Sequence, residues 1–369
     1  MPGLYGVGLL LLFVVVRDSV TLDTPTTPKT RRLLIDTDAG FDVDDVGALC
    51  VANALMDRGE VDIIAVGHTN AFVKGVGAVS ALMAFYNHTA VPIGAYKGPW
   101  GRDPAAGAHP HHTADRYVSD LADHFPATVR TSAEVPTAVS VYRRALAAQD
   151  DHSVYLVSIG ITTNMRDLVR SLPDVHSPLT GRELLARKAV EIVWMDGTYN
   201  FGCAQHATFN WLGSDVDCYG SSHIAVSEWP PSIHQVFTNV GSTILHGATL
   251  STCALPNNPC RQAFLDWGHG AAQIGRMSWD PLAVLIAARG ATNIGLYVQQ
   301  DGYNTVAEDG TERWIRDSGR VYNQSRIRVG DFIRPDVRAA LTDELNRLLC
   351  QRPYTTLIGA PNQSKNTKN

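Results

Sequence analysis

The stretch Leu33-Leu34-Ile35-Asp36-Thr37-Asp38-Ala39-Gly40-Phe41-Asp42-Val43-Asp44-Asp45 decides the fold. Its three consecutive aliphatic residues predict a strand buried on both faces, as in a parallel sheet covered by helices on each side. Gly40 predicts a tight turn, and the apolar residues Val46, Leu49 and Leu55 predict a helix after it. In an open α/β sheet, this order places the aspartates at the carboxyl end of a strand, where such folds bind ligands.

The turn carries five aspartates within ten positions. Two carboxylates 4 Å apart repel each other by roughly 4 kcal/mol at an effective dielectric constant of about 20. A solvated acidic loop would relieve this repulsion, but the flanking strand and helix draw the turn towards the interior. A hard divalent cation with oxygen ligands, such as calcium or magnesium, fits the pattern better. The turn therefore predicts a metal site.

The segment from Asp36 to Asp45, followed by Val-Gly-Ala-Leu, resembles the N-terminal signature of the inosine/uridine-preferring nucleoside N-ribohydrolases. It is similar to the variant of that signature with two extra residues before the Asp-Asp pair, and the resemblance extends, with gaps, from about Arg31 to Cys350. The resemblance implies that Asp38 and Asp45 bind Ca²⁺, that Asp38 also activates a metal-bound water, and that Asp44 binds the ribose hydroxyls.

Two later segments extend the resemblance. Gly160-Ile161-Thr162-Thr163-Asn164 is similar to a family segment in which a threonine carbonyl binds calcium, which implies Thr163 as a ligand. Ser278-Trp279-Asp280-Pro281 lies where the family has its last calcium-binding aspartate, which implies Asp280. Both residues also suit a helix start, with Asp280 as N-cap and Pro281 at the first helical position. Trp279 replaces a histidine that purine-accepting members use to activate the leaving base.

The sugar-binding residues match the family less completely. Asn210 matches the asparagine of a Glu-Phe-Asn segment, but Thr208 replaces its glutamate. Asn200 is a candidate replacement partner for the sugar hydroxyls, although asparagine in a loop is commonly a turn residue. His109, His111 and His112 lie in a Gly/Pro-rich loop, which is either a flap that supplies protons or an ordinary surface loop.

Strand and helix patterns alternate along the chain. Strands are predicted at 61–66, 91–95, 153–160, 190–197, 233–240, 296–298 and 325–329, and helices at 73–86, 137–149, from near 165, 280–289 and 336–349. We expect one large α/β domain over residues 31–352, with a mostly parallel, Rossmann-like sheet flanked by helices, as in the nucleoside hydrolase fold. Residues 353–369 read as a polar tail.

The N-terminal segment and the glycosylation sequons predict a secreted protein. Residues 1–20 include an apolar run, Val7 to Val16, that is predicted to belong to a signal peptide and is too short to span a bilayer; a Thr/Pro linker follows at 21–30. The net charge of −5 gives no basic surface for nucleic acid. Sequons at Asn87, Asn323 and Asn362 are compatible with a glycoprotein.

Six cysteines suit an oxidising compartment. Cys253 and Cys260 flank a short loop and are the first choice for a disulfide bond. Cys50 lies within the first predicted helix and is expected to be a small core residue.

Together these features predict calcium-dependent hydrolysis of the N-glycosidic bond of purine or pyrimidine nucleosides. The expected partner is a small nucleoside, and a homo-oligomer is left open. Two alternatives stay open. One is a secreted metal- and sugar-binding protein without turnover, suggested by Thr208 and Trp279. The other is an Asp-x-Asp phosphatase with Asp36 as nucleophile and Asp38 as acid/base, which Ala39-Gly40 and the extra aspartates disfavour.

Overall fold

The computed structural model describes residues 30–40, 42–70, 72–98, 117–195, 221–238, 240–308, 312–317, 319–328 and 333–354. The predicted signal peptide, almost all of the linker and the tail from residue 355 lie outside these ranges. So do Asn200, Thr208, Asn210, the three flap histidines, and two of the six cysteines. None of the helices in the described ranges is long and apolar enough to cross a membrane.

An eight-stranded sheet forms the centre of the molecule, in the order β3-β2-β1-β4-β5-β6-β12-β9. Seven strands run parallel, and β9 is antiparallel to β12. The predicted single α/β domain with a mostly parallel sheet is therefore confirmed. The strands are β1 Arg31–Thr37, β2 Val61–His68, β3 Ile93–Ala95, β4 Val154–Ser158, β5 Ala189–Met195, β6 His234–Thr238, β9 Val298–Gln299 and β12 Gln324–Ile327.

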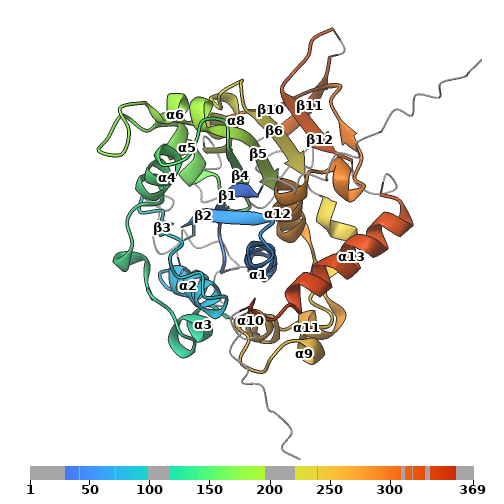
Figure 1. Cartoon of the computed structure of the whole chain (residues 1–369). Helices are drawn as coiled ribbons and strands as arrows, with labels where there is room; N and C mark the ends of the chain where they lie inside the picture. Colours follow the sequence, from blue (N-terminus) through green and yellow to red (C-terminus); the bar gives the residue numbers. More distant parts are fainter. Residues whose placement is uncertain are drawn as a thin grey trace, which may run out of the picture.

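Helices cover both faces of this sheet (Figure 1). One face packs against α1 Asp44–Asp57, α2 Gly75–Phe85, α12 Trp279–Arg289 and α13 Pro335–Leu349. The other packs against α4 Ala138–Ala147, α5 Thr163–Arg170, α6 Gly181–Lys188 and α8 Ser221–Ser227. Leu33 and Ile35 of β1 enter the first core and Leu34 enters the second, which is why the strand needs an unbroken apolar run.

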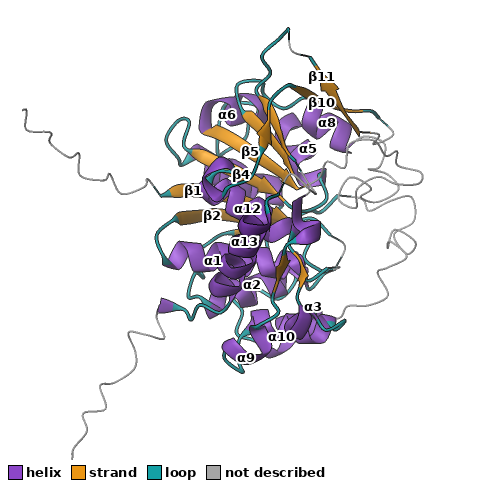
Figure 2. Ribbon diagram, turned by 90° about the vertical axis from the view of Figure 1, so that its right-hand side faces the viewer, coloured by secondary structure: helices purple, strands orange, loops and turns teal. Residues whose placement is uncertain are grey.

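Smaller elements complete the described chain. They are α3 Val118–His124, α9 Leu250–Cys253, α10 Pro259–Trp267 and α11 Ala271–Ile274, together with the two-stranded pairs β7 Leu245–His246 with β8 Arg276–Met277, and β10 Gly302–Val306 with β11 Glu312–Arg316. Figure 2 shows the β10–β11 hairpin at the opposite end of the molecule from α9 and α10.

The predicted disulfide between Cys253 and Cys260 is wrong. Cys260 is bonded to Cys50, and Cys253 is bonded to Cys350. The reason is the start of α10: the Asn258 side chain accepts hydrogen bonds from the N–H groups of Cys260 and Arg261 and so caps the helix. Cys260 is fully buried against α1, where it bonds to Cys50. Cys50 is therefore a core residue, as predicted, but its sulfur forms a disulfide and is not a free thiol.

Candidate metal and substrate site

Strand β1 ends at the point where the order of the sheet reverses. The chain leaves β1 for β2 and β3 on one side and then returns to add β4 on the other side. Loops on either side of such a switch point separate and leave a crevice at the carboxyl end of the strands. The aspartate turn follows β1 directly, so its carboxylates lie at the carboxyl end of the strands at this switch point, as the sequence predicts.

Three buried carboxylates converge there. Asp44 and Asp45 are the first two residues of α1, and Asp280 is the second residue of α12. The prediction that Asp280 is the N-cap of this helix is wrong, because Ser278 is the N-cap. One carboxylate oxygen from each of the three lies within 4.8 Å of the other two. At most 4% of each residue is exposed to solvent. The N-termini of two helices thus bring three acidic groups to one point.

Asp38 lies beside this cluster and is held through its backbone. Its N–H donates a hydrogen bond to Oδ1 of Asp45 at 3.2 Å, and the Thr37 hydroxyl donates to the same oxygen. The side-chain amide of Asn70 donates to the carbonyl oxygen of Asp38 at 2.6 Å. The Oδ2 atom of Asp38 is buried and has no hydrogen-bond partner in the described chain, and the same holds for Oδ1 of Asp280.

The electrostatics of the cluster favour a bound cation. Burial raises the pKa of Asp38 to about 8, and the charges of Asp44 and Asp36 act in the same direction. The pKa values of Asp44, Asp45 and Asp280 also lie well above the usual range, first because of burial and then because the carboxylates repel one another. A divalent cation would stabilise the ionised forms, and an all-oxygen donor set suits calcium or magnesium. The residues therefore fit a hard divalent cation.

A second buried network ties Thr163 to the end of β1. Thr163 is fully buried and is the first residue of α5, which begins slightly earlier than predicted. Its neighbour Asn164 donates a hydrogen bond from Nδ2 to Oδ1 of Asp36 at 2.8 Å, and the Tyr142 hydroxyl donates to the same oxygen. Burial raises the pKa of Asp36 to about 7, and these two hydrogen bonds oppose that rise. Asp36 thus fixes α5 beside the aspartate turn.

Trp279 lies next to the carboxylate cluster because it immediately precedes Asp280. The Arg276 guanidinium lies 4.9 Å from the centroid of the Trp279 ring and 5.0 Å from that of Trp267. Arg276 also forms a two-point ion pair with Asp42, in which Nε and Oδ1 are 2.9 Å apart. The positive charge of Arg276 lowers the pKa of Asp44 and offsets part of the carboxylate repulsion.

Two buried histidines that the sequence analysis did not single out as site residues brace the site. Nε2 of His68 lies 2.9 Å from the carbonyl oxygen of Ala39, and Nδ1 of His246 lies 2.9 Å from that of Arg276. Burial lowers the pKa of both side chains to about 4, so both are neutral at pH 7. His68 lies two residues after the strand predicted at 61–66, at the carboxyl end of a strand, and this position marks it as a neighbour of the site. The sequence around His246 offers no such signal.

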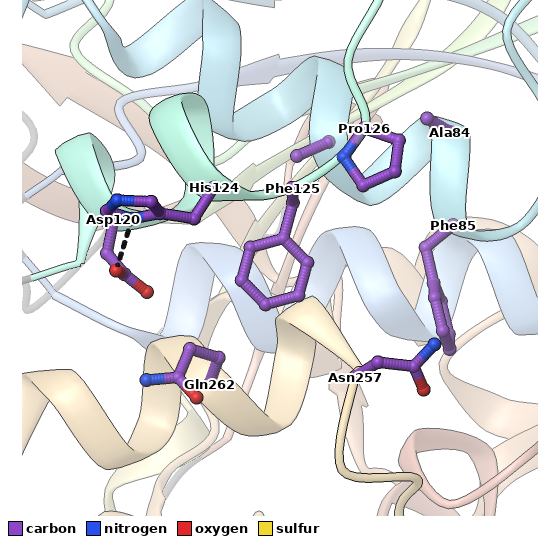
Figure 3. A pocket seen from close by; sticks show the side chains of 9 residues that line it. Ala84, Phe85, Asp120, His124, Phe125, Pro126, Asn257 and Gln262 are labelled. Atoms are coloured by element: carbon purple, nitrogen blue, oxygen red, sulfur yellow. Dashed lines mark hydrogen bonds and ion pairs between the residues drawn. The ribbon is translucent and has the colours of Figure 1, made fainter.

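A separate cavity of about 480 Å³ lies between α2, α3 and α10. Figure 3 shows Phe85, Phe125 and Pro126 around it, with Asp120, His124 and Gln262 at one side. Nδ1 of His124 is 2.8 Å from Oδ1 of Asp120. None of the predicted site residues lines this cavity. It is therefore distinct from the carboxylate cluster.

Solved structures share this architecture. A purine-preferring ribonucleoside hydrolase from Gardnerella vaginalis aligns over 87% of this chain and 99% of its own, with a TM-score of 0.61 and 16% identity. An inosine-uridine preferring nucleoside hydrolase from Bacillus anthracis gives the same coverage and TM-score at 14% identity. The type III effector protein XopQ, solved with adenosine diphosphate ribose, aligns over 87% of this chain and 95% of its own, with a TM-score of 0.62 and 14% identity.

The sequence by itself matches no protein-family model and no curated protein. The likeness therefore rests on three-dimensional structure. It extends over most of this chain and nearly the whole of the compared chains. The protein has the nucleoside hydrolase fold, as the resemblance of its aspartate turn implied.

Proposed function

We propose that the protein hydrolyses the N-glycosidic bond of nucleosides and that this activity depends on calcium. The observation that carries the proposal is the convergence of Asp44, Asp45 and Asp280 at the switch point of a nucleoside hydrolase fold. Three buried carboxylates with raised pKa values call for a cation, and oxygen-only ligands suit calcium. The proposed metal ligands are Asp45, Asp280, Asp38 and the carbonyl oxygen of Thr163, whereas Asp44 is assigned to the ribose hydroxyls.

In this proposal, separate residues activate the attacking water and bind the sugar. A bound divalent cation would orient a water molecule and lower its pKa. Asp38 accepts a proton from that water, because its Oδ2 atom is buried and has no other partner in the described chain. Asp44 lies in the same cluster as Asp45 and Asp280. Together with Asn210, it binds the hydroxyl groups of the sugar and so orients the sugar. Attack at the anomeric carbon passes through an oxocarbenium-like state.

The leaving base needs a partner as well. His68 and His246 are not suited to donate a proton to it, because both are buried, neutral and bonded to backbone carbonyls. Trp279 offers an indole beside Asp280 on which a base can stack, and the Arg276 guanidinium lies over the same ring, 4.9 Å from its centroid. The flap histidines, outside the described residues, are the other candidates for the acid.

A base-release assay tests this proposal. Full-length protein is treated with a chelator and then assayed with inosine, adenosine, uridine and cytidine, with Ca²⁺, with Mg²⁺ or without metal. We expect release of free base and ribose that disappears with chelator and returns with Ca²⁺. Asp280→Asn should raise the Ca²⁺ concentration needed for activity. Base release that persists in the chelator-treated protein would contradict a metal-dependent mechanism.

A binding protein without turnover is the second candidate, and Trp279 in the place of a catalytic histidine favours it. One structural neighbour was solved with adenosine diphosphate ribose, which makes that molecule a suitable probe beside the nucleosides. A ligand that raises the melting temperature without forming product would support this candidate, because binding to the folded state alone stabilises it.

We further propose that the protein is secreted after removal of the signal peptide predicted within residues 1–20. Two disulfides among the described cysteines and the exposed side chains of Asn87 and Asn323 support an oxidising, extracellular environment. Mass spectrometry of protein from the culture medium tests the new N-terminus and the glycans. Light scattering tests whether a homo-oligomer forms.

A further inference from the structure

His246 occupies a buried position between the two helices that carry the carboxylate cluster. It is the last residue of β7, is 0% exposed, and pairs in the sheet with Arg276 of β8. The chain continues from β8 through Ser278, the N-cap of α12, to Asp280. On its other side the imidazole faces α1, which begins with Asp44 and Asp45.

Hydrogen bonds tie the ring to the start of α12. Nδ1 lies 2.9 Å from the carbonyl oxygen of Arg276 and 3.0 Å from the hydroxyl oxygen of Ser278. A carbonyl only accepts, so Nδ1 carries the proton and Nε2 does not. The N–H of Ser278 is held in turn by the carbonyl of Gly241 at 3.1 Å. The residue that precedes Trp279 and Asp280 is therefore fixed from two directions.

The missing side chain at Gly47 leaves room for the imidazole ring of His246 against α1. A Cβ atom at Gly47 would lie 2.1 Å from Nε2 of His246 and 3.3 Å from Cγ of Pro281, which follows Asp280. Glycine inside a helix costs about 1 kcal/mol relative to alanine, so a buried helical glycine needs a packing reason. Here the reason is the imidazole, which the Phe264 ring contacts edge-on at 5.3 Å between ring centroids.

We propose that His246 is a positioning residue whose ring, seated on Gly47, sets the spacing between the first turns of α1 and α12. That spacing fixes how the oxygens of Asp45 and Asp280 face each other, and therefore the affinity of the site for a cation. The inference rests on the proposed metal site. Groups that orient metal ligands typically change metal affinity by about 10- to 100-fold when they are mutated.

The experiment measures Ca²⁺ binding to chelator-treated, full-length protein by calorimetry. Tb³⁺ luminescence excited through tryptophan gives a second readout, because Trp279 adjoins Asp280. Gly47→Ala should weaken Ca²⁺ binding about 10- to 100-fold, since its methyl group collides with the ring. His246→Ala should also weaken it. The double variant should bind no worse than His246→Ala, because the new methyl group enters the space that the ring has left.

Two further variants separate positioning from general stability. Gly77→Ala in α2 is the matched control: its Cβ would lie 2.4 Å from the carbonyl oxygen of Arg130, away from the site. It should lower the melting temperature and leave Ca²⁺ affinity unchanged. His246→Asn keeps a side-chain N–H near the Arg276 carbonyl and should bind Ca²⁺ more tightly than His246→Ala.

The outcomes distinguish the inference from the proposed function. If wild-type protein binds Ca²⁺, and Gly47→Ala and His246→Ala are folded and bind it within about threefold of wild type, the positioning role is wrong while the metal site stands. Additive losses in the double variant would also overturn it. If the wild-type protein binds neither Ca²⁺ nor Tb³⁺, the metal site fails and the inference fails with it.

Discussion

The backbone N–H of Asp38 donates a hydrogen bond to Oδ1 of Asp45 across 3.2 Å. This bond closes the aspartate turn onto the first turn of α1, and the Thr37 hydroxyl reinforces it from the end of β1. Asp38 makes this contact through its backbone, and Oδ2 of its carboxylate has no hydrogen-bond partner among the described residues. Oδ1 of Asp45 thus accepts two hydrogen bonds from the aspartate turn.

Asp38→Asn should lower turnover by about 10²- to 10⁴-fold, because the amide cannot accept the proton of the attacking water. The backbone hydrogen bond to Asp45 is kept, so the fold should survive. Steady-state base release and the thermal melting curve measure the two effects separately. An Asp38→Asn variant that retains wild-type turnover would show that another residue is the base.

Asp44→Asn should instead weaken sugar binding, seen as a higher KM, while Ca²⁺ affinity changes little. The reason is that we assign Asp44 to a ribose hydroxyl, although its carboxylate lies in the same cluster as Asp45 and Asp280. Calorimetric titration of Ca²⁺ into this variant decides the assignment. Loss of Ca²⁺ binding would make Asp44 a metal ligand.

Reduction should lower the melting temperature through the bond between Cys253 and Cys350, which are 97 residues apart in sequence. Removal of a native disulfide typically costs about 2–5 kcal/mol, mainly because the unfolded chain gains freedom. Cys253→Ser/Cys350→Ser should reproduce part of the loss seen with reductant, and adding reductant to this variant should reveal the contribution of Cys50–Cys260. Wild-type protein whose melting curve does not respond to reductant would argue against both bonds.

Asp266→Asn should raise the melting temperature at pH 7.5 and leave it unchanged at pH 4. Burial, and then the neighbouring Asp120 carboxyl, raise the pKa of Asp266 to about 6 from the usual 3.8. The stability that the protonated carboxyl contributes is therefore complete below about pH 4 and is lost as the pH rises through about 6. The amide stays neutral throughout this range. Differential scanning fluorimetry over pH 4–8 measures the difference.

Asp336→Asn is the control with the opposite sign. Arg334 lowers the pKa of Asp336 to about 2, so its contribution to stability is present above about pH 4 and is lost as the pH falls through about 2. Asp336→Asn should therefore lower the melting temperature slightly at pH 7.5. A rise in both variants would indicate a general effect of net charge.

Local sequence predicts the centre of this fold well. An unbroken Leu-Leu-Ile run suits a strand buried on both faces, and Leu33 and Leu34 do enter different cores. The aspartates follow directly, so their place at the strand end is set within a few residues. The strands predicted at 296–298 and 325–329 correspond to β9 and β12, which pair antiparallel to each other.

Features that depend on distant partners were missed. Proximity in the chain favours a bond between Cys253 and Cys260, but the cap at Asn258 directs Cys260 to Cys50. The helix α6 is a local feature that the predicted helices do not include, although the capping box of Thr180 and Glu183 marks its start. The contact of His246 with Gly47 joins residues whose spacing carries no pattern.

The residues of the carboxylate cluster lie far apart in the sequence, which affects when the cluster can form in a newly made chain. Asp44 and Asp45 leave the ribosome early, whereas Asp280 and the neighbouring strand β8 emerge only after most of the sheet has been synthesised. Contacts over such long sequence separations form late in folding. Until α12 docks on α1, the nascent protein lacks the complete carboxylate cluster of the proposed cation site. Tight ion binding would therefore mark a nearly completed molecule and would favour folded chains over partly made ones.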